Sequence, residues 1–111
     1  MSSDVAGQAV VVVARIPAKP GEAPQLADAF ATARPQVHAE DAGCLLYAAH
    51  VGDDDSVWIV EKWASADELD AHGRSDAMKA IGAAIGHHVA GRPEVHRLTA
   101  VPTPGSDKGA L

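Results

Sequence analysis

The chain has 111 residues, a formal net charge of -6 and no run of lysine or arginine. This length allows one domain with one core, and the acidic charge argues against nucleic acid and anionic membrane as main partners. Hydrophobic residues make up 47% of the chain but aromatic residues only 4%, so each aromatic side chain calls for a specific reason.

The N-terminal part predicts a flexible arm followed by a strand. Residues 1–8 are small and polar, which is typical of a loose arm. Residues 10–16 form a β-branched run that ends before a Lys-Pro-Gly turn, and this pattern predicts a strand. Because the run is apolar on both alternating faces, both faces should be covered.

A helix is expected from about Pro24 to the Glu-Asp-Ala-Gly stretch at 40–43. Pro35 lacks an amide hydrogen and should kink this helix or loosen its last turn. Spacings of four, three and four give the helix one apolar stripe: Leu26, Phe30, Ala33 and Val37.

Two further strands should form an antiparallel hairpin. Residues 44–51 (CLLYAAHV) and the strand that begins at Val57 flank a polar turn at 52–55. In the second strand, alternation puts Glu61 and Trp63 on one face, together with Val57 and Ile59. The other face carries Trp58, Val60 and Lys62.

The segment after this hairpin predicts a helix and a pocket. Ser65 and Glu68 have the spacing of a capping box, so a helix should start at Ser65. Leu69 and His72 share one face of that helix. A helix that folds back over its own strand would bring them above Glu61 and Trp63, and we expect a pocket between sheet and helix.

A further helix should follow Ser75 and end at 91–93 (Gly-Arg-Pro). Residues 94–101 predict the last strand, and residues 102–111 a turn-rich tail. The apolar stripe of the helix has spacings of three, four and four: Met78, Ile81, Ile85 and Val89.

The order β-α-β-β-α-β predicts an α+β fold of the ferredoxin-like, split βαβ type, formed by residues 9–101. Its four-stranded antiparallel sheet should carry both helical regions on one face. The other face is also apolar, and nothing in the chain is left to cover it. We therefore expect a homodimer that packs through this open sheet face, with a pocket in each subunit.

These motifs, in this order, resemble the antibiotic biosynthesis monooxygenase (ABM) domain family over about residues 10–101. They are the turn at 19–21, Gly43-Cys44-x-x-Tyr47, Glu61-Lys62-Trp63 and the segment 67–72 (DELDAH). The resemblance implies a dimeric ferredoxin-like α+β barrel. It also implies either an oxygenase that acts on quinols or aromatic polyketides without metal or flavin, or a haem-degrading enzyme.

The branches of the family differ at single positions. The haem-degrading branch has Asn, Trp and a haem-ligating His where this chain has Ala14, His72 and Ile81, which argues against haem degradation. The polyketide-oxidising branch shares Trp63 but has Asn and Tyr at Ile59 and Leu69. The quinol-monooxygenase-like group, with Glu61, Trp63 and His72, resembles the chain best.

An oxygenase without a cofactor needs a base, a dry cavity and a donor for the developing oxyanion or peroxide. His72 suits the base because imidazole titrates near neutrality, although it can equally be a capping or surface histidine. Glu61 is the alternative base if burial raises its pKa, or else the partner of Arg15 or another basic residue in a cross-strand ion pair. Trp63 offers a flat wall and one N–H donor, or simply fills the core.

The substrate-binding residues of this hypothesis are Phe30, Tyr47, Ile59, Leu69, Met78 and Ile81. The face on which Tyr47 points depends on a strand register that sequence does not fix. Cys44 should pack as a small buried hydrophobe. His87 and His88, adjacent on the expected helix, point in different directions, so we expect no metal site and no cofactor.

The leading functional hypothesis is a cofactor-independent monooxygenase of a quinol-like or aromatic polyketide-like small molecule, with O₂ as the second substrate. A non-catalytic ligand-binding dimer is the alternative, and a stress-related interaction protein whose pocket is filled by its own side chains is a third. A single cysteine, no signal-peptide pattern and no apolar run of the roughly 20 residues that span a bilayer point to the cytoplasm.

Overall fold

The computed structural model describes residues 8–101 and 103–111, so residues 1–7 of the expected arm and Pro102 of the expected tail lie outside the described part. The elements follow the predicted order, with the second helical region in two pieces. They are β1 (Val10–Pro17), α2 (Ala23–Glu40), β2 (Cys44–Val51), β3 (Ser56–Trp63), α3 (Ala66–Gly73), α4 (Asp76–Ile85) and β4 (Glu94–Thr99).

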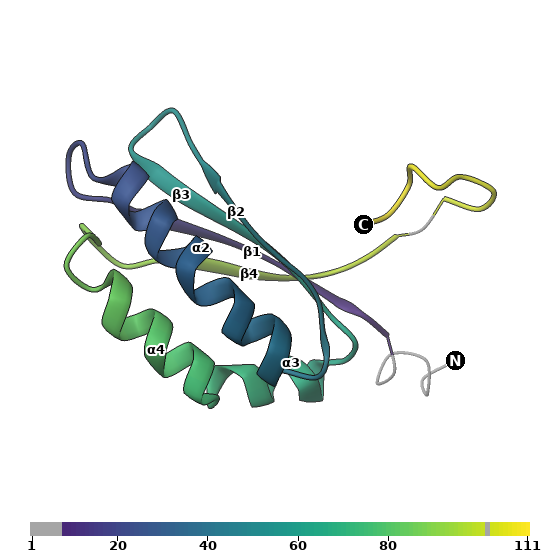
Figure 1. Cartoon of the computed structure of the whole chain (residues 1–111). Coiled ribbons are helices and arrows are strands. Elements are labelled where there is room, and N and C mark those ends of the chain that lie inside the picture. The colour runs from purple at the N-terminus through teal and green to yellow at the C-terminus, as the bar shows by residue number, and fades with distance from the viewer. Residues whose placement is uncertain (1–7, 102) are drawn as a thin grey trace.

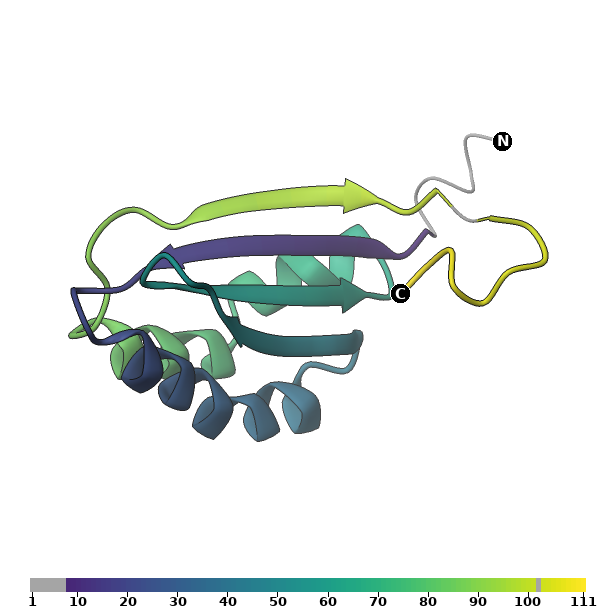
Figure 2. The same cartoon turned by 90° about the horizontal axis from the view of Figure 1, so that it is seen from above.

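The four strands form one antiparallel sheet in the order β2-β3-β1-β4. The three helices lie on one side of it (Figures 1 and 2). The fold is therefore the ferredoxin-like α+β fold that the sequence predicts. β1 lies between β3 and β4, and its residues Val12, Ala14 and Ile16 are buried beneath the helices.

The first helix ends where the sequence predicts, and its last turn is more regular than Pro35 suggests. α2 continues through Pro35 to Glu40, and the amide of Asp41 donates to the carbonyl of Val37 at 3.0 Å, so the last turn is intact. Pro35 and Ala31 are both exposed. Water can therefore satisfy the Ala31 carbonyl that lacks its usual amide donor, and the expectation of a loosened last turn is wrong.

The last helix is shorter than predicted, because α4 ends at Ile85. Beyond it, the carbonyl of His88 accepts from the amide of Lys19 at 2.8 Å, and the amide of Ala90 donates to the carbonyl of Pro17 at 2.8 Å. These bonds to the end of β1 replace helical ones, and glycines at 82 and 86 lower the helical propensity. Contrary to the expectation, residues 87–89 are therefore not helical, and β4 ends at Thr99 rather than at residue 101.

Both serine caps form where the sequence predicts them. Ser65 Oγ accepts from the amide of Glu68 at 3.2 Å, and Ser75 Oγ accepts from the amide of Met78 at 3.0 Å. The reciprocal bond from Glu68 to the Ser65 amide is not formed among the described residues. The Glu68 side chain lies instead against Gly43, where a Cβ would collide with it.

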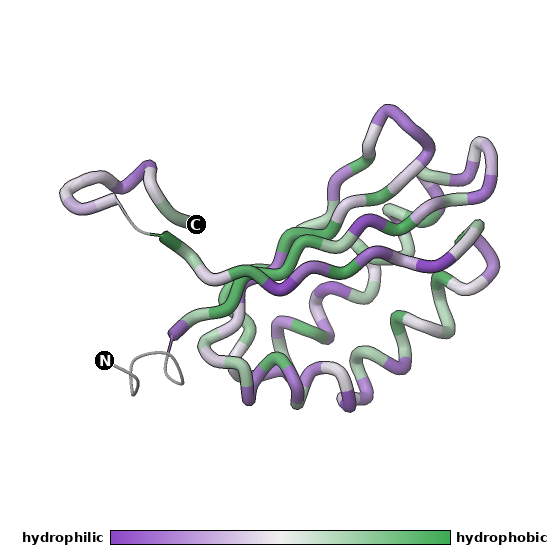
Figure 3. Tube along the Cα trace, turned by 180° about the vertical axis from the view of Figure 1, so that it is seen from behind, coloured by the Kyte–Doolittle hydropathy of each residue, from purple (hydrophilic) through white to green (hydrophobic). Residues whose placement is uncertain are grey.

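The strands contain many apolar residues (Figure 3), and some of these lie on the sheet face away from the helices. The strand register places Val13, Trp58 and Val60 there, half-buried, with Leu98 of β4 at the edge. No helix among the described residues is long and apolar enough to cross a bilayer.

The helix-covered core should supply most of the stability. Leu26 on α2 is 0% exposed, so Leu26→Ala should lower the free energy of unfolding by about 2–5 kcal/mol in urea titrations. Leu45→Ala is the matched control because Leu45 is 58% exposed, and it should change stability by less than about 0.5 kcal/mol. Equal losses in the two variants would contradict this assignment of the core.

Candidate functional site

A cavity of about 510 Å³ lies between the helices and the sheet. The residues proposed from the sequence as substrate-binding, Phe30, Tyr47, Ile59, Leu69, Met78 and Ile81, all line it. Glu61 and His72 line it as well, whereas Trp63 does not. Buried residues of β1 and β3 form its floor, and exposed residues of α3, α4 and β4 lie on its open side.

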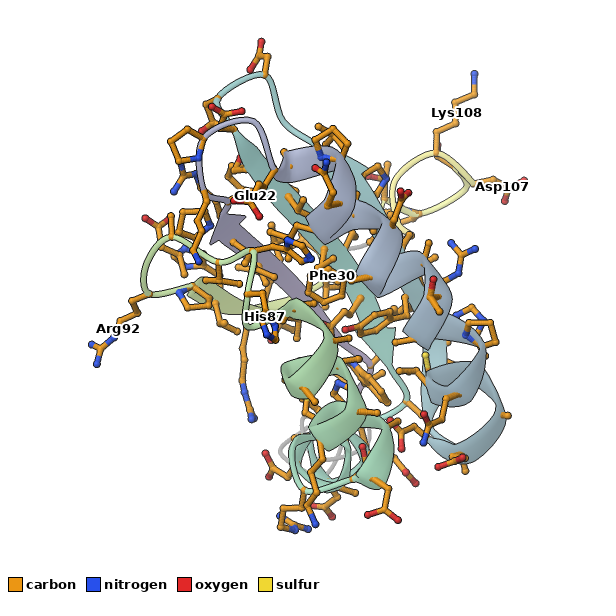
Figure 4. The ribbon with its side chains drawn as sticks, turned by 60° about the vertical axis from the view of Figure 1, so that its left-hand side comes forward. Glu22, Phe30, His87, Arg92, Asp107 and Lys108 are labelled. Carbon is orange, nitrogen blue, oxygen red and sulfur yellow. The ribbon has the colours of Figure 1, made fainter. Side chains whose placement is uncertain are left out.

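The labelled Phe30 in Figure 4 points from α2 into the space between the sheet and α4. Tyr47 lies on the same side of the sheet, because it pairs with Glu61 in the β2–β3 register and is buried. The structure thus fixes the register that the sequence left open.

Glu61 is a buried carboxyl group without an ionic partner on its own sheet. Its Oε1 accepts a hydrogen bond from Trp63 Nε1 at 2.8 Å. Arg15, its expected partner, lies on the opposite face and pairs instead with Asp54, Nη2 to Oδ2, at 2.9 Å. Burial raises the pKa of Glu61, and the hydrogen bond from Trp63 and the nearby His72 oppose this rise only in part.

His72 is held by a residue that sequence analysis did not identify as functional. Its Nδ1 lies 2.5 Å from Oδ2 of Asp41, and the two side chains are only 6% and 8% exposed. Asp41 follows α2 directly, and Ser75 Oγ also donates to its Oδ2, at 3.3 Å. The sequence showed Asp41 only as part of a helix end, and no local pattern links it to a residue 31 positions away.

The Asp41 contact fixes the chemistry of the imidazole. An ionised carboxylate only accepts hydrogen bonds, so Nδ1 of His72 donates, and in the neutral ring Nε2 carries the free lone pair. Nε2 has no hydrogen-bond partner among the described residues. Every fully buried side-chain nitrogen or oxygen in this part of the chain does have one. Nε2 is therefore not fully buried, and His72 lines the cavity.

Trp63 supports the site from behind. Its ring is fully buried and stacks on the His72 imidazole, with centroids 4.5 Å apart and planes at 29°. Tyr47 meets the imidazole edge to face at 5.7 Å. The sequence-based expectation that Trp63 itself forms the cavity wall is therefore wrong, because the cavity lining includes His72 but not the indole stacked on it.

The remaining reactive groups are held in their neutral forms. Burial, with the neighbouring Glu61 as the second cause, raises the pKa of the Tyr47 phenol, which therefore stays a hydrogen-bond donor at neutral pH. Burial likewise raises the pKa of the half-buried Cys44 thiol and makes it a poor nucleophile. The described residues contain no group of three His, Cys, Asp or Glu side chains that could hold a metal ion.

Residues 9–84 match the family model described as antibiotic biosynthesis monooxygenase. The chain belongs to this family. A proposed antibiotic biosynthesis monooxygenase from Caulobacter crescentus is 31% identical, with 90% of this chain and 96% of that one covered and a TM-score of 0.78. Comparison with curated proteins gave no match.

Two more distant structures share the fold. One is a proposed antibiotic biosynthesis monooxygenase from Bordetella bronchiseptica, 23% identical with a TM-score of 0.76, over 85% of this chain and 98% of that one. The other is a protein of unknown function from Nitrosomonas europaea, 20% identical with a TM-score of 0.73, over 91% and 99%. At these identities the likeness concerns the fold alone.

The burial of Glu61 predicts a pH dependence of stability. Its pKa is raised in the folded protein above the ordinary value of 4.5, so the folded state keeps a proton that the unfolded chain releases. Wild-type stability should therefore fall, relative to Glu61→Gln, as pH rises from about 4.5 through the folded-state pKa.

Urea unfolding of both proteins across this pH range measures the difference. The glutamine side chain of the variant keeps an oxygen that can accept from Trp63 Nε1, so the substitution removes only the titration. Glu94→Gln, at an exposed site, controls for the loss of one negative charge. A constant stability difference between wild type and Glu61→Gln at all pH values would contradict the prediction.

Proposed function

We propose that this protein is a cofactor-independent monooxygenase of a quinol-like or aromatic polyketide-like small molecule. The observation that carries the proposal is the buried Asp41–His72 pair, whose imidazole lines a cavity that is otherwise lined largely by apolar side chains. The family membership supports the general class of reaction. The substrate class follows from the resemblance to quinol-monooxygenase-like members and from the apolar character of the cavity.

In the proposed reaction, His72 Nε2 removes a proton from a phenolic hydroxyl, and Asp41 stabilises the imidazolium that forms. The electron-rich phenolate reduces O₂, and a new C–O bond forms at a ring carbon that carries hydrogen. Loss of water then leaves a ring carbonyl. One oxygen atom enters the product, the other leaves as water, and the substrate supplies all four electrons, so no external reductant is needed.

Glu61 and Tyr47 are proposed as donors rather than bases. Burial raises the pKa of Glu61, and in the protonated form its hydroxyl can donate while the other oxygen accepts from Trp63. The Tyr47 phenol is a second donor at the same end of the cavity. Both can stabilise the negative charge that develops on a peroxide oxygen.

The sequence also raised two non-catalytic alternatives, an interaction protein with a filled pocket and a ligand-binding protein. A cavity is present beside His72, so the filled pocket expected of an interaction protein is not observed. A non-catalytic binding protein would use the same apolar cavity. It would show ligand-dependent thermal stabilisation without O₂ consumption, whereas the proposed enzyme shows both.

The proposal includes a homodimer built through the open sheet face. Val13, Trp58 and Val60 form a half-buried apolar surface there, with an exposed Leu98 beside it. A soluble chain gains stability by covering such a surface with a second copy.

His72 should be essential for oxygen uptake. With a panel of hydroquinones and naphthols, His72→Gln should lower kcat by about 10² to 10⁴, the usual contribution of a positioned base. Asp41→Asn should lower kcat less and change the pH profile, because the tautomer of His72 is no longer fixed. Uptake measured by oxygen electrode provides the readout.

His87→Gln is the control because His87 lies beyond α4 and is not part of the cavity lining. Loss of activity in Glu61→Gln with retention in His72→Gln would assign the base to Glu61 instead. Oxygen uptake that is absent for all substrates, or independent of both residues, would contradict the proposed function.

The dimer can be tested by light scattering at micromolar concentration, where the wild type should have twice the mass of one chain. Val60→Glu places a charge in the centre of the open face and should give a monomer. Ala31→Glu, on the exposed side of α2, should remain dimeric. A monomeric wild type would contradict this proposal.

A further inference from the structure

The charged and titratable residues that line the cavity form two groups, one buried and one exposed. Glu61 and His72 lie at the buried end, whereas the exposed end carries Asp70, Arg74 and Arg97. The chain has a net charge of -6 and only nine Lys and Arg in total, yet two of the nine line this one opening. An acidic protein that places two guanidinium groups at the mouth of an apolar cavity has a local surface suited to an anion.

The two arginines are only partly occupied by the protein itself. Arg97 of β4 donates from Nη2 to Asp70 Oδ1 at 2.7 Å, which leaves its Nε and Nη1 without a hydrogen bond among the described residues. Arg74, directly after α3, has no carboxylate within 4.0 Å in that part of the chain. The Asp70–Arg97 ion pair alone is enough to join α3 to β4. A purely structural role therefore does not explain why Arg74 also lies at the opening.

We propose that the mouth of the cavity is an anion subsite in which Arg97 and Arg74 bind a carboxylate of the substrate. The ligand class is an aromatic carboxylic acid that carries a phenolic hydroxyl at its far end. The planar guanidinium group matches the two oxygens of a carboxylate and binds it through two parallel hydrogen bonds. The inference rests on the proposed function for the phenolic end of the ligand only.

The cavity fixes how such a ligand lies. Apolar side chains of Ile59, Leu69 and Ile81 enclose the ring, and the carboxylate stays at the exposed end, where its desolvation cost is small. The opposite hydroxyl then reaches the end with His72. A ligand in the reverse orientation would bury its carboxylate at the enclosed end of the cavity, where the loss of hydration is unfavourable.

A matched pair of ligands tests the subsite: a hydroxynaphthoic acid and its carboxamide, which have nearly the same size and shape, but only the acid is negatively charged at neutral pH. Calorimetric titration of the wild type should give about tenfold tighter binding of the acid, equivalent to about 1.4 kcal/mol. This preference should shrink at high salt, because the mouth is exposed.

Arg97→Gln and Arg74→Gln should each reduce the ratio of the affinity for the acid to the affinity for the amide towards one. The affinity for the amide itself should stay within about twofold of the wild-type value. Asp70→Asn removes the competing carboxylate and should increase the ratio. Arg92→Gln is the matched control, since Arg92 points away from the body of the protein (Figure 4) and is not part of the cavity lining. It should leave the ratio unchanged.

Because both ligands meet the same variant, partial loss of folding does not affect the ratio. A ratio near one in the wild type, a ratio unaffected by both arginine substitutions, or no binding of either ligand would overturn the subsite. Oxygen uptake separates the two proposals. Selective binding of the acid without uptake would refute the monooxygenase alone, and equal turnover of acid and amide with equal affinity would refute the subsite alone.

Discussion

The contacts of one buried imidazole join most of the elements of this fold. His72 on α3 lies against Asp41 at the end of α2, stacks on Trp63 of β3 and meets Tyr47 of β2 edge to face. The hydroxyl of Ser75, which caps α4, lies within hydrogen-bond distance of both the carbonyl of His72, at 2.8 Å, and Asp41 Oδ2, at 3.3 Å. The helices and the sheet are thus held at the distance that the cavity between them requires.

This arrangement has an energetic cost that a purely structural core would avoid. Burying ionisable groups is unfavourable unless they are paired, and an apolar replacement of a buried pair is often equally stable or more so. The protein nevertheless places Glu61, His72 and Asp41 in one cluster, with Trp63 donating to the first and stacking on the second. Such a cluster on the wall of a cavity is typical of a functional site.

Sequence patterns predicted the features that depend on local periodicity or capping. Alternation along β3 identified the buried face of Glu61 and Trp63, and the serines at 65 and 75 gave the starts of α3 and α4. The sequence patterns did not predict features that depend on contacts between residues far apart in the sequence. The end of α4 depends on hydrogen bonds from residues 88 and 90 to β1 and the turn after it, and Asp41 meets His72 only through the tertiary fold. The position of Trp63 behind the imidazole, too, follows from packing and not from strand alternation.

The same strand register that buries Glu61 also determines where a positively charged side chain can lie on the sheet. In β4, Val95 pairs with Ala14 and Arg97 with Val12, so both face the helices although the strand is exposed along its whole length. The helices lie on this side of the sheet but leave the edge strand exposed, so a long polar side chain there can reach water while its stem covers apolar surface. The edge position of β4 therefore allows a charged group at the opening of the cavity, whereas the central β1 and β3 confine the inner end to residues that tolerate burial.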